Sequence, residues 1–226
     1  MKWPEVLARD PVYLNLGGGT HCHPEPGYEN YISVDLHPLP GDWAVQHDLR
    51  RPIPLPADSV ARFHTEDFLE HVATQDSRAL LVECHRLLAP GGRMRIGVPD
   101  YGNPKDRFCL ALGRDPRDPK HVTLTHHQWM RDLLAASPFT RSRFYHYWDG
   151  DRFVRQPIDY SLGMIRRTPD NDPRCRRAGL AKMLFGALHD GGRVLLRGSR
   201  ASRLERSAWR GHPLHVTSLV VDLFKD

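Results

Sequence analysis

The residues best suited to chemistry lie in a glycine-rich turn and in an acid that follows it. The apolar segment Val12–Leu16 leads into Gly17–Gly19, and a second apolar segment, Tyr31–Val34, ends at Asp35. Glycines let the backbone approach a ligand where a Cβ atom would collide. An acid about 20 residues after the first glycine is spaced to accept hydrogen bonds from ribose hydroxyls. The pattern predicts an adenosine-containing cofactor, although a plain turn and an acidic helix cap would explain each half alone.

Short apolar runs alternate with helical patterns through the first half of the chain. The segment Thr74–Leu88 is predicted to be a helix, because its apolar residues share one face and Pro90–Gly92 would stop it. The prolines between Gly19 and Tyr31 predict an irregular loop instead of a crossover helix. Alternating strands and helices imply an α/β fold with a parallel sheet that binds ligands at the carboxyl ends of its strands. The predicted strands are Val12–Leu16, Tyr31–Val34, Trp43–Gln46, Val60–His64 and Arg93–Val98.

The alternation becomes irregular after Asp100. Two helices are predicted by their apolar faces, and a strand, a turn and a second strand are predicted between them. A last buried strand should close the chain. In chain order these elements are His126–Ala136, Phe144–Trp148, the turn Asp149–Asp151, Arg152–Arg155, Ala178–Leu188 and Val216–Phe224.

Composition is that of an ordinary globular protein. The 226 residues are 40% hydrophobic and 26% charged, which suits one large domain. The N-terminus lacks the apolar segment of a signal peptide, and no run approaches the roughly 18 apolar residues of a membrane span. The cysteines form no Cys-x-x-Cys pair, so we expect a reduced, cytoplasmic protein. They are Cys22, Cys84, Cys109 and Cys175.

Positive charge is concentrated in the C-terminal third, although the formal net charge is only +5. A solvated surface explains this pattern, as does attraction to an anionic substrate, a nucleic acid or an acidic membrane face. The arginines are Arg166, Arg167, Arg174, Arg176, Arg177, Arg193, Arg197, Arg200, Arg203, Arg206 and Arg210.

Several sequence blocks occur in one fixed order. They are Leu14–Gly19, Val34–Asp35, His47–Leu49 with Leu55–Val60, Phe68–Val72 and Glu83–Gly92. In that order they resemble the motifs of class I S-adenosylmethionine-dependent methyltransferases, specifically the type-11 group. Gly163–Pro169 and Thr217–Asp222 further resemble a bacterial subgroup of predicted methyltransferases.

This resemblance implies a Rossmann-like, doubly wound, mostly parallel seven-stranded sheet with an antiparallel last strand. It implies S-adenosylmethionine as cofactor and in-line methyl transfer to a small-molecule or glycan-type acceptor. The catalytic residue stays unknown, with Glu66, His71 and His121 as candidate bases. The implied cofactor contacts are Asn15, Gly17, Gly18, Gly19, Asp35, Leu36, Asp48, Leu49, Thr65 and Glu66.

Departures from the motifs keep other functions open. Asn15 stands where such enzymes usually carry an acid, and Val60-Ala61 replaces a usual Phe-Asp pair. A catalytically silent module that keeps the fold would explain both changes. A nucleic-acid methyltransferase would explain the arginines, and a nicotinamide oxidoreductase is a weaker alternative.

The domain organisation follows from the same comparison. We expect a single domain over residues 1–226, a candidate lid over 101–125 and a helical, arginine-rich insertion over 175–211. The apolar face of Ala178–Leu188 would pack on the domain or on a second copy in a homodimer. Metal binding at His21–His23 is not predicted, because no neighbouring residue completes a ligand set around the two imidazoles. The methyl acceptor cannot be predicted.

Overall fold

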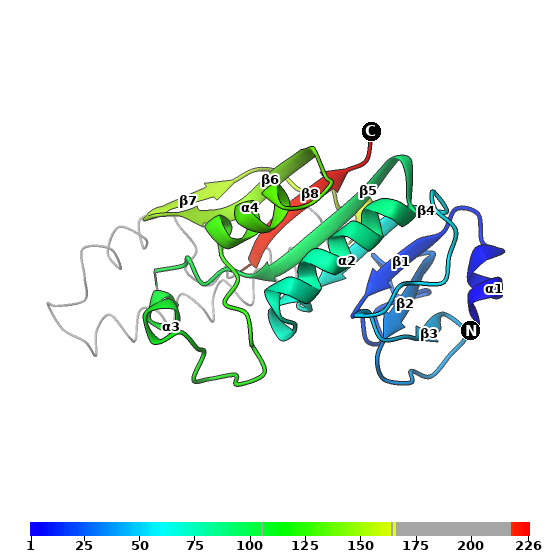
Figure 1. Ribbon diagram of the computed structural model, residues 1–226, viewed down its shortest axis with the longest axis horizontal. Coiled ribbons are helices and arrows are strands. Elements are labelled where there is room, and N and C mark those ends of the chain that lie inside the picture. The colour runs from blue at the N-terminus through cyan, green and yellow to red at the C-terminus, as the bar shows by residue number, and fades with distance from the viewer. Residues whose placement is uncertain (105, 164, 166–217) are drawn as a thin grey trace, which may run out of the picture.

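An eight-stranded sheet forms the centre of the part of the chain that the structure describes (Figure 1). The computed structural model describes residues 1–104, 106–163, 165 and 218–226. Its strands are β1 (Tyr13–Leu16), β2 (Tyr31–Asp35), β3 (Ala44–Gln46), β4 (Val60–Glu66), β5 (Leu88–Pro99), β6 (Arg141–Asp149), β7 (Arg152–Arg155) and β8 (Ser218–Phe224). Its helices are α1 (Trp3–Leu7), α2 (Thr74–Leu87), α3 (Arg107–Leu112) and α4 (His127–Ala135), with 3-10 turns η1 (Leu69–His71) and η2 (Tyr160–Leu162).

The strand order is β3-β2-β1-β4-β5-β8-β6-β7. Strands β1 to β5 are parallel, whereas β8 runs antiparallel to both β5 and β6. The predicted Rossmann-like sheet with an antiparallel last strand is therefore confirmed. The predicted number of seven strands is wrong by one, because the turn at Asp149–Asp151 folds β7 back onto β6 as an edge hairpin.

Helix α2 connects β4 to β5 and packs by the apolar face that predicted it. Leu80, Leu81, Cys84 and Leu87 are all buried. The helix ends at Leu87, and the predicted stop at Pro90–Gly92 instead lies inside β5. Helices α2 and α4 lie on the same face of the sheet (Figure 1), joined by a 3.1 Å hydrogen bond from Trp129 Nε1 to Thr74 Oγ1.

The connection from β1 to β2 contains no helix, as its prolines predict. It folds as a series of turns that buries Tyr28 to 1% exposure. The Tyr28 hydroxyl donates to Glu66 Oε2 at 3.4 Å, at the end of β4. The short crossover therefore places a loop at the carboxyl edge of the sheet.

A buried ion pair ties β5 to β8. Arg95 is 1% exposed and donates through Nε and Nη2 to the two carboxylate oxygens of Asp222, at 2.8 and 2.9 Å. Its Nη1 donates to the carbonyls of Asp159 and Gly163. Tyr145 adds a hydrogen bond to Asp222 at 3.0 Å. The bidentate geometry offsets the desolvation of both charges, because each charged atom keeps a partner.

Two predictions fall on residues that the structure does not describe. The helix Ala178–Leu188 and the insertion 175–211 lie outside the described residues. Within the described ranges, none of the helices has the length and apolar character of a membrane span.

Candidate functional site

The glycine-rich turn lies at the carboxyl end of β1 and has one open position. A Cβ atom on Gly17 would lie 2.3 Å from the ring of Phe68, and one on Gly18 would lie 2.3 Å from the Asn15 amide. Both glycines are therefore required by packing within the chain itself. Gly19 has a φ of +54°, and a Cβ atom there would meet no atom within 4 Å. Gly19 is thus the glycine whose backbone faces free space.

Asp35 lies directly beside this turn. Its Oδ2 accepts a hydrogen bond from the Gly19 amide at 3.2 Å, and its Oδ1 accepts one from the His37 amide at 3.1 Å. The Ser33 hydroxyl donates to the Gly19 carbonyl at 2.7 Å. Each carboxylate oxygen has a further lone pair, so Asp35 can hold the turn and still accept ligand hydroxyls.

Asn15 provides a buried acceptor below the turn. The residue is 2% exposed, and its Nδ2 donates to the His21 carbonyl at 2.7 Å. Its Oδ1 is buried and has no hydrogen-bond partner among the described residues. Since a buried polar atom without a partner costs about 1–3 kcal/mol, this oxygen fits a site that takes a donor from a bound ligand.

The predicted cofactor contacts Leu36, Asp48 and Leu49 differ in how available they are to a ligand. Asp48 already accepts two hydrogen bonds from the Arg50 guanidinium, at 2.8 and 2.9 Å, which lower the pKa of its carboxyl to about 2. The Leu49 side chain is buried in the hydrophobic core, so only its backbone can reach a ligand. Leu36 is 50% exposed beside Asp35 and can cover an apolar ring.

Thr65 and Glu66 end β4 as predicted, but they point to opposite faces because strand side chains alternate. Glu66 lies with Tyr28, whose ring also packs against His64. Thr65 is 1% exposed on the face that carries the core residue Phe63. Of the two residues, Glu66 is therefore the one that contacts the loop over the site.

The other two candidate bases come together. The rings of His71 and His121 are 4.8 Å apart in an edge-to-face arrangement. His71 belongs to η1, which follows β4, whereas His121 precedes α4. Thr123 ties the two segments, because its amide donates to the Glu70 carbonyl at 3.0 Å and its hydroxyl to the Val72 carbonyl at 2.7 Å.

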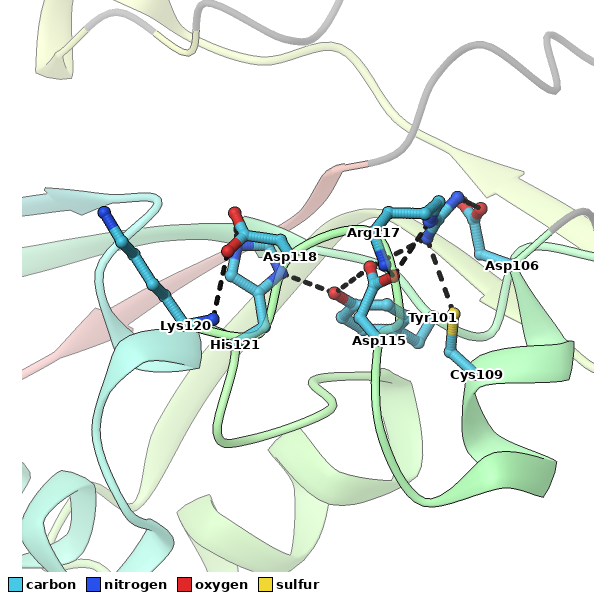
Figure 2. Close-up of polar contacts among 8 residues, drawn as sticks. All are labelled: Tyr101, Asp106, Cys109, Asp115, Arg117, Asp118, Lys120 and His121. Atoms are coloured by element: carbon cyan, nitrogen blue, oxygen red, sulfur yellow. Dashed lines mark hydrogen bonds and ion pairs between the residues drawn. The ribbon is translucent and has the colours of Figure 1, made fainter.

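A chain of charged and polar side chains holds His121 in place (Figure 2). Its Nδ1 lies 2.5 Å from the Tyr101 hydroxyl, which donates to Asp115 Oδ2 at 2.8 Å. Arg117 donates to both oxygens of Asp115 and to Asp106 Oδ1. These contacts hold the pKa of the Asp115 carboxyl well below its ordinary value, while burial raises the pKa of the Tyr101 hydroxyl. Tyr101 therefore stays a protonated donor to a carboxylate.

Asp100 is a buried acid that sequence reasoning missed. It follows β5, is 2% exposed and accepts hydrogen bonds from the amides of Trp148 and Gly102, at 2.7 and 2.9 Å. Burial raises the pKa of its carboxyl to about 7, against the lowering effect of those hydrogen bonds. A single acid after a strand carries no sequence signal that separates it from a surface residue.

The histidines of the loop after β1 do not converge. His21 Nδ1 lies 2.7 Å from Glu25 Oε2, and the His23 ring packs on Trp43 with 4.1 Å between ring centroids. These two imidazoles therefore have different partners, Glu25 and Trp43.

Comparison with solved structures shows that this chain has the fold of SAM-dependent methyltransferases. A SAM-dependent methyltransferase from Archaeoglobus fulgidus has a TM-score of 0.52 and 15% identity, over 94% of this chain and 85% of that one. A SAM-dependent methyltransferase from Thermotoga maritima has a TM-score of 0.51 and 13% identity, over 95% and 81%. Phosphoethanolamine N-methyltransferase 2 from Haemonchus contortus, solved with phosphomonomethylethanolamine and S-adenosylhomocysteine, has a TM-score of 0.51 and 13% identity, over 94% and 48%. No protein-family model matches the sequence, and no curated protein matches it either.

Proposed function

Because the chain has the fold of class I methyltransferases, we propose that it transfers a methyl group from S-adenosylmethionine to a small-molecule or glycan-type acceptor. The observation that carries the proposal is the pairing of the open Gly19 backbone with the Asp35 carboxylate at the carboxyl edge of the sheet. That edge is where parallel α/β sheets bind their ligands.

The residues around the turn have the chemistry that this cofactor needs. Asp35 would accept the ribose hydroxyls, and Asn15 Oδ1 would accept a donor from the amino acid part. Leu36 and the Leu49 amide would contact the adenine, with Asp48 as a weaker partner because Arg50 already occupies it. When bound, S-adenosylmethionine supplies a methyl group activated by its sulfonium. The task of the chain is then to exclude water and align the acceptor.

The acceptor would enter beside the ends of β4 and β5. A hydroxyl acceptor must lose a proton, and Glu66, His71 and His121 are the candidate bases there. The segment 101–125 would cover the acceptor. Its anchoring supports this role, since the Tyr101 amide donates to the Thr125 carbonyl and so joins both ends of the segment. An acceptor pocket closed by such a segment suits a small molecule or a sugar.

Specific sequence features favour two other functions. The arginines of the C-terminal third would suit a nucleic-acid methyltransferase, but all of those named above lie outside the described residues. A silent module is favoured by Asn15, because it brings no charge to the cofactor site.

We further propose one domain over residues 1–226 with an insertion at 175–211, a cytoplasmic location and a homodimer. The reduced thiols support the cytoplasm, since Cys22, Cys84 and Cys109 are all free.

The experiment is a transfer assay with methyl-labelled S-adenosylmethionine. Purified protein is offered small hydroxyl compounds, sugars, amines and RNA, and the label is followed into each acceptor. Transfer to a hydroxyl compound or sugar is the expected result. Transfer to RNA alone would favour the nucleic-acid function, and cofactor binding without transfer to any acceptor would favour the silent module.

A further inference from the structure

Three side chains with metal-binding atoms converge next to the ends of β4 and β5. Glu70 and His71 come from η1, and His121 comes from the loop before α4. One ligand atom of each residue lies within 4.8 Å of the other two. Glu70 is fully buried, whereas His71 is exposed and His121 is partly buried, so the cluster opens toward solvent on one side.

The surroundings of His71 set which ring nitrogen is available. Its Nδ1 lies 3.1 Å from the Lys120 carbonyl oxygen. A carbonyl only accepts, so Nδ1 carries the proton and Nε2 carries the lone pair. Histidines that bind metal ions commonly donate their second ring nitrogen to a backbone carbonyl in this way, which fixes the orientation of the ring.

The same reasoning applies to His121 (Figure 2). Tyr101 gives its single proton to Asp115, so its oxygen accepts from His121 Nδ1 at 2.5 Å. The lone pair of His121 is then on Nε2, which lies 3.3 Å from Asp118 Oδ2. A metal ion bound at this nitrogen would lie close to the Asp118 carboxylate.

We propose that Glu70, His71 and His121 bind a divalent transition metal ion of the zinc class. Two imidazoles and one carboxylate form a ligand set typical of zinc sites that keep one coordination position open. In both histidines Nδ1 is held by another group, the Lys120 carbonyl or the Tyr101 hydroxyl, so Nε2 is the nitrogen that a shared ion would bind. Asp118, at the rim, would be an outer partner of the ion.

A role for this metal ion rests on the proposed function. The ion would bind the acceptor hydroxyl at its open position and lower the pKa of that hydroxyl, so that its proton passes to solvent water on the open side of the cluster. The alkoxide oxygen would then form a bond to the methyl carbon as the carbon–sulfur bond breaks and S-adenosylhomocysteine leaves. His71 and His121 would then be ligands instead of bases.

The test is a Co²⁺ titration of tag-free protein that has been treated with chelator, followed through the visible absorption of the bound ion. One equivalent should bind with an apparent Kd of about 10 μM or tighter, as expected of three protein ligands, and Zn²⁺ should displace it. His71→Ala and His121→Ala should each weaken binding by at least about tenfold, and Tyr101→Phe should weaken it by a similar factor through the orientation of His121. The matched control is His37→Ala, since His37 is an exposed histidine outside the cluster.

Circular dichroism separates loss of ligands from loss of fold. Because His71 is exposed, its removal should leave the spectrum unchanged. The proposal is overturned if the wild-type protein binds neither ion, or if the two histidine variants bind as well as His37→Ala does. Calorimetry of S-adenosylhomocysteine binding to the metal-free protein distinguishes failure of the metal site from failure of the proposed methyltransferase function. A protein that binds the cofactor but no metal ion would overturn only the metal site.

Discussion

The two halves of the carboxyl edge are built in different ways. On the cofactor side, backbone groups and a few nearby side chains form the site, as when the Gly19 amide meets Asp35 only 16 positions away. On the acceptor side, side chains from distant segments form it, as when His71 meets the Lys120 carbonyl across 49 positions. The comparison teaches that the first half depends on backbone conformation, whereas the second depends on buried charges keeping their partners.

The largest effect should come from breaking the buried ion pair between β5 and β8, which lie in the half of the sheet next to the acceptor side. Asp222→Ala leaves the Arg95 guanidinium buried without its carboxylate, which should lower the free energy of unfolding by about 3–5 kcal/mol. Urea denaturation followed by circular dichroism measures this change. A double variant, Arg95→Met with Asp222→Leu, should recover part of the loss. A loss below about 1 kcal/mol in the single variant would show that buried charges do not stabilise this half.

The second effect is the pH dependence contributed by Asp100. Its folded-state pKa of about 7 lies above its ordinary value of 3.8, so the native state holds a proton that the unfolded state has lost. The stability contribution of Asp100 should therefore fall as pH rises from about 4 to 7, by on the order of 4 kcal/mol, and stay constant above that. The measurement is the unfolding free energy of the wild type and of Asp100→Asn over this pH range. The value for the wild type minus that for the variant should fall as pH rises. A difference that rises with pH would contradict it.

On the cofactor side, the effect should be on binding more than on stability. Gly19→Ala puts a Cβ atom at a φ of +54° and into the free space beside Asp35. Gly91→Ala is the matched control, because Gly91 has a φ of +74°, open space around it and a place near the start of β5. Both variants should lose about 1–2 kcal/mol of stability. Only Gly19→Ala should weaken S-adenosylmethionine binding, by about tenfold; equal affinities in the two variants would count against the turn as a binding site.

The smallest effect is expected at Asp48. Its carboxylate is partly exposed and already paired with Arg50, so Asp48→Ala should weaken cofactor binding by less than about fivefold. Equilibrium binding beside the exposed control Asp42→Ala measures it. A loss as large as that of an Asp35 variant would show that Asp48 is a principal adenine contact despite Arg50.

The difference between the cofactor side and the acceptor side also explains which features could be predicted from the sequence. The turn at Gly17–Gly19, the acid at Asp35 and the helix after β4 are specified by neighbouring residues, and the structure has all three at the predicted places. The irregular first crossover follows from its prolines. The turn Asp149–Asp151 and the strand after it were also predicted, although their addition of an eighth strand to the sheet was not.

The acceptor side could not be predicted because its contacts join distant segments. Nothing near Tyr101 in the sequence indicates that it meets both Asp115 and His121, or that His71 packs on His121. Tyr28 looks like an ordinary loop aromatic until the fold brings it to Glu66. Such partners are chosen by tertiary packing, which leaves no local pattern.

The most direct test of the central claim is calorimetry of S-adenosylhomocysteine binding to the wild-type protein and to Asp35→Ala. The account predicts one binding site per chain in the wild type and a loss of at least about 150-fold in the variant, since two hydrogen bonds to a charged acceptor are removed at about 1.5–3 kcal/mol each. Asp42→Ala should bind like the wild type. Absence of binding to the wild-type protein, equal affinity in Asp35→Ala, or binding of NAD in place of S-adenosylhomocysteine would contradict the account.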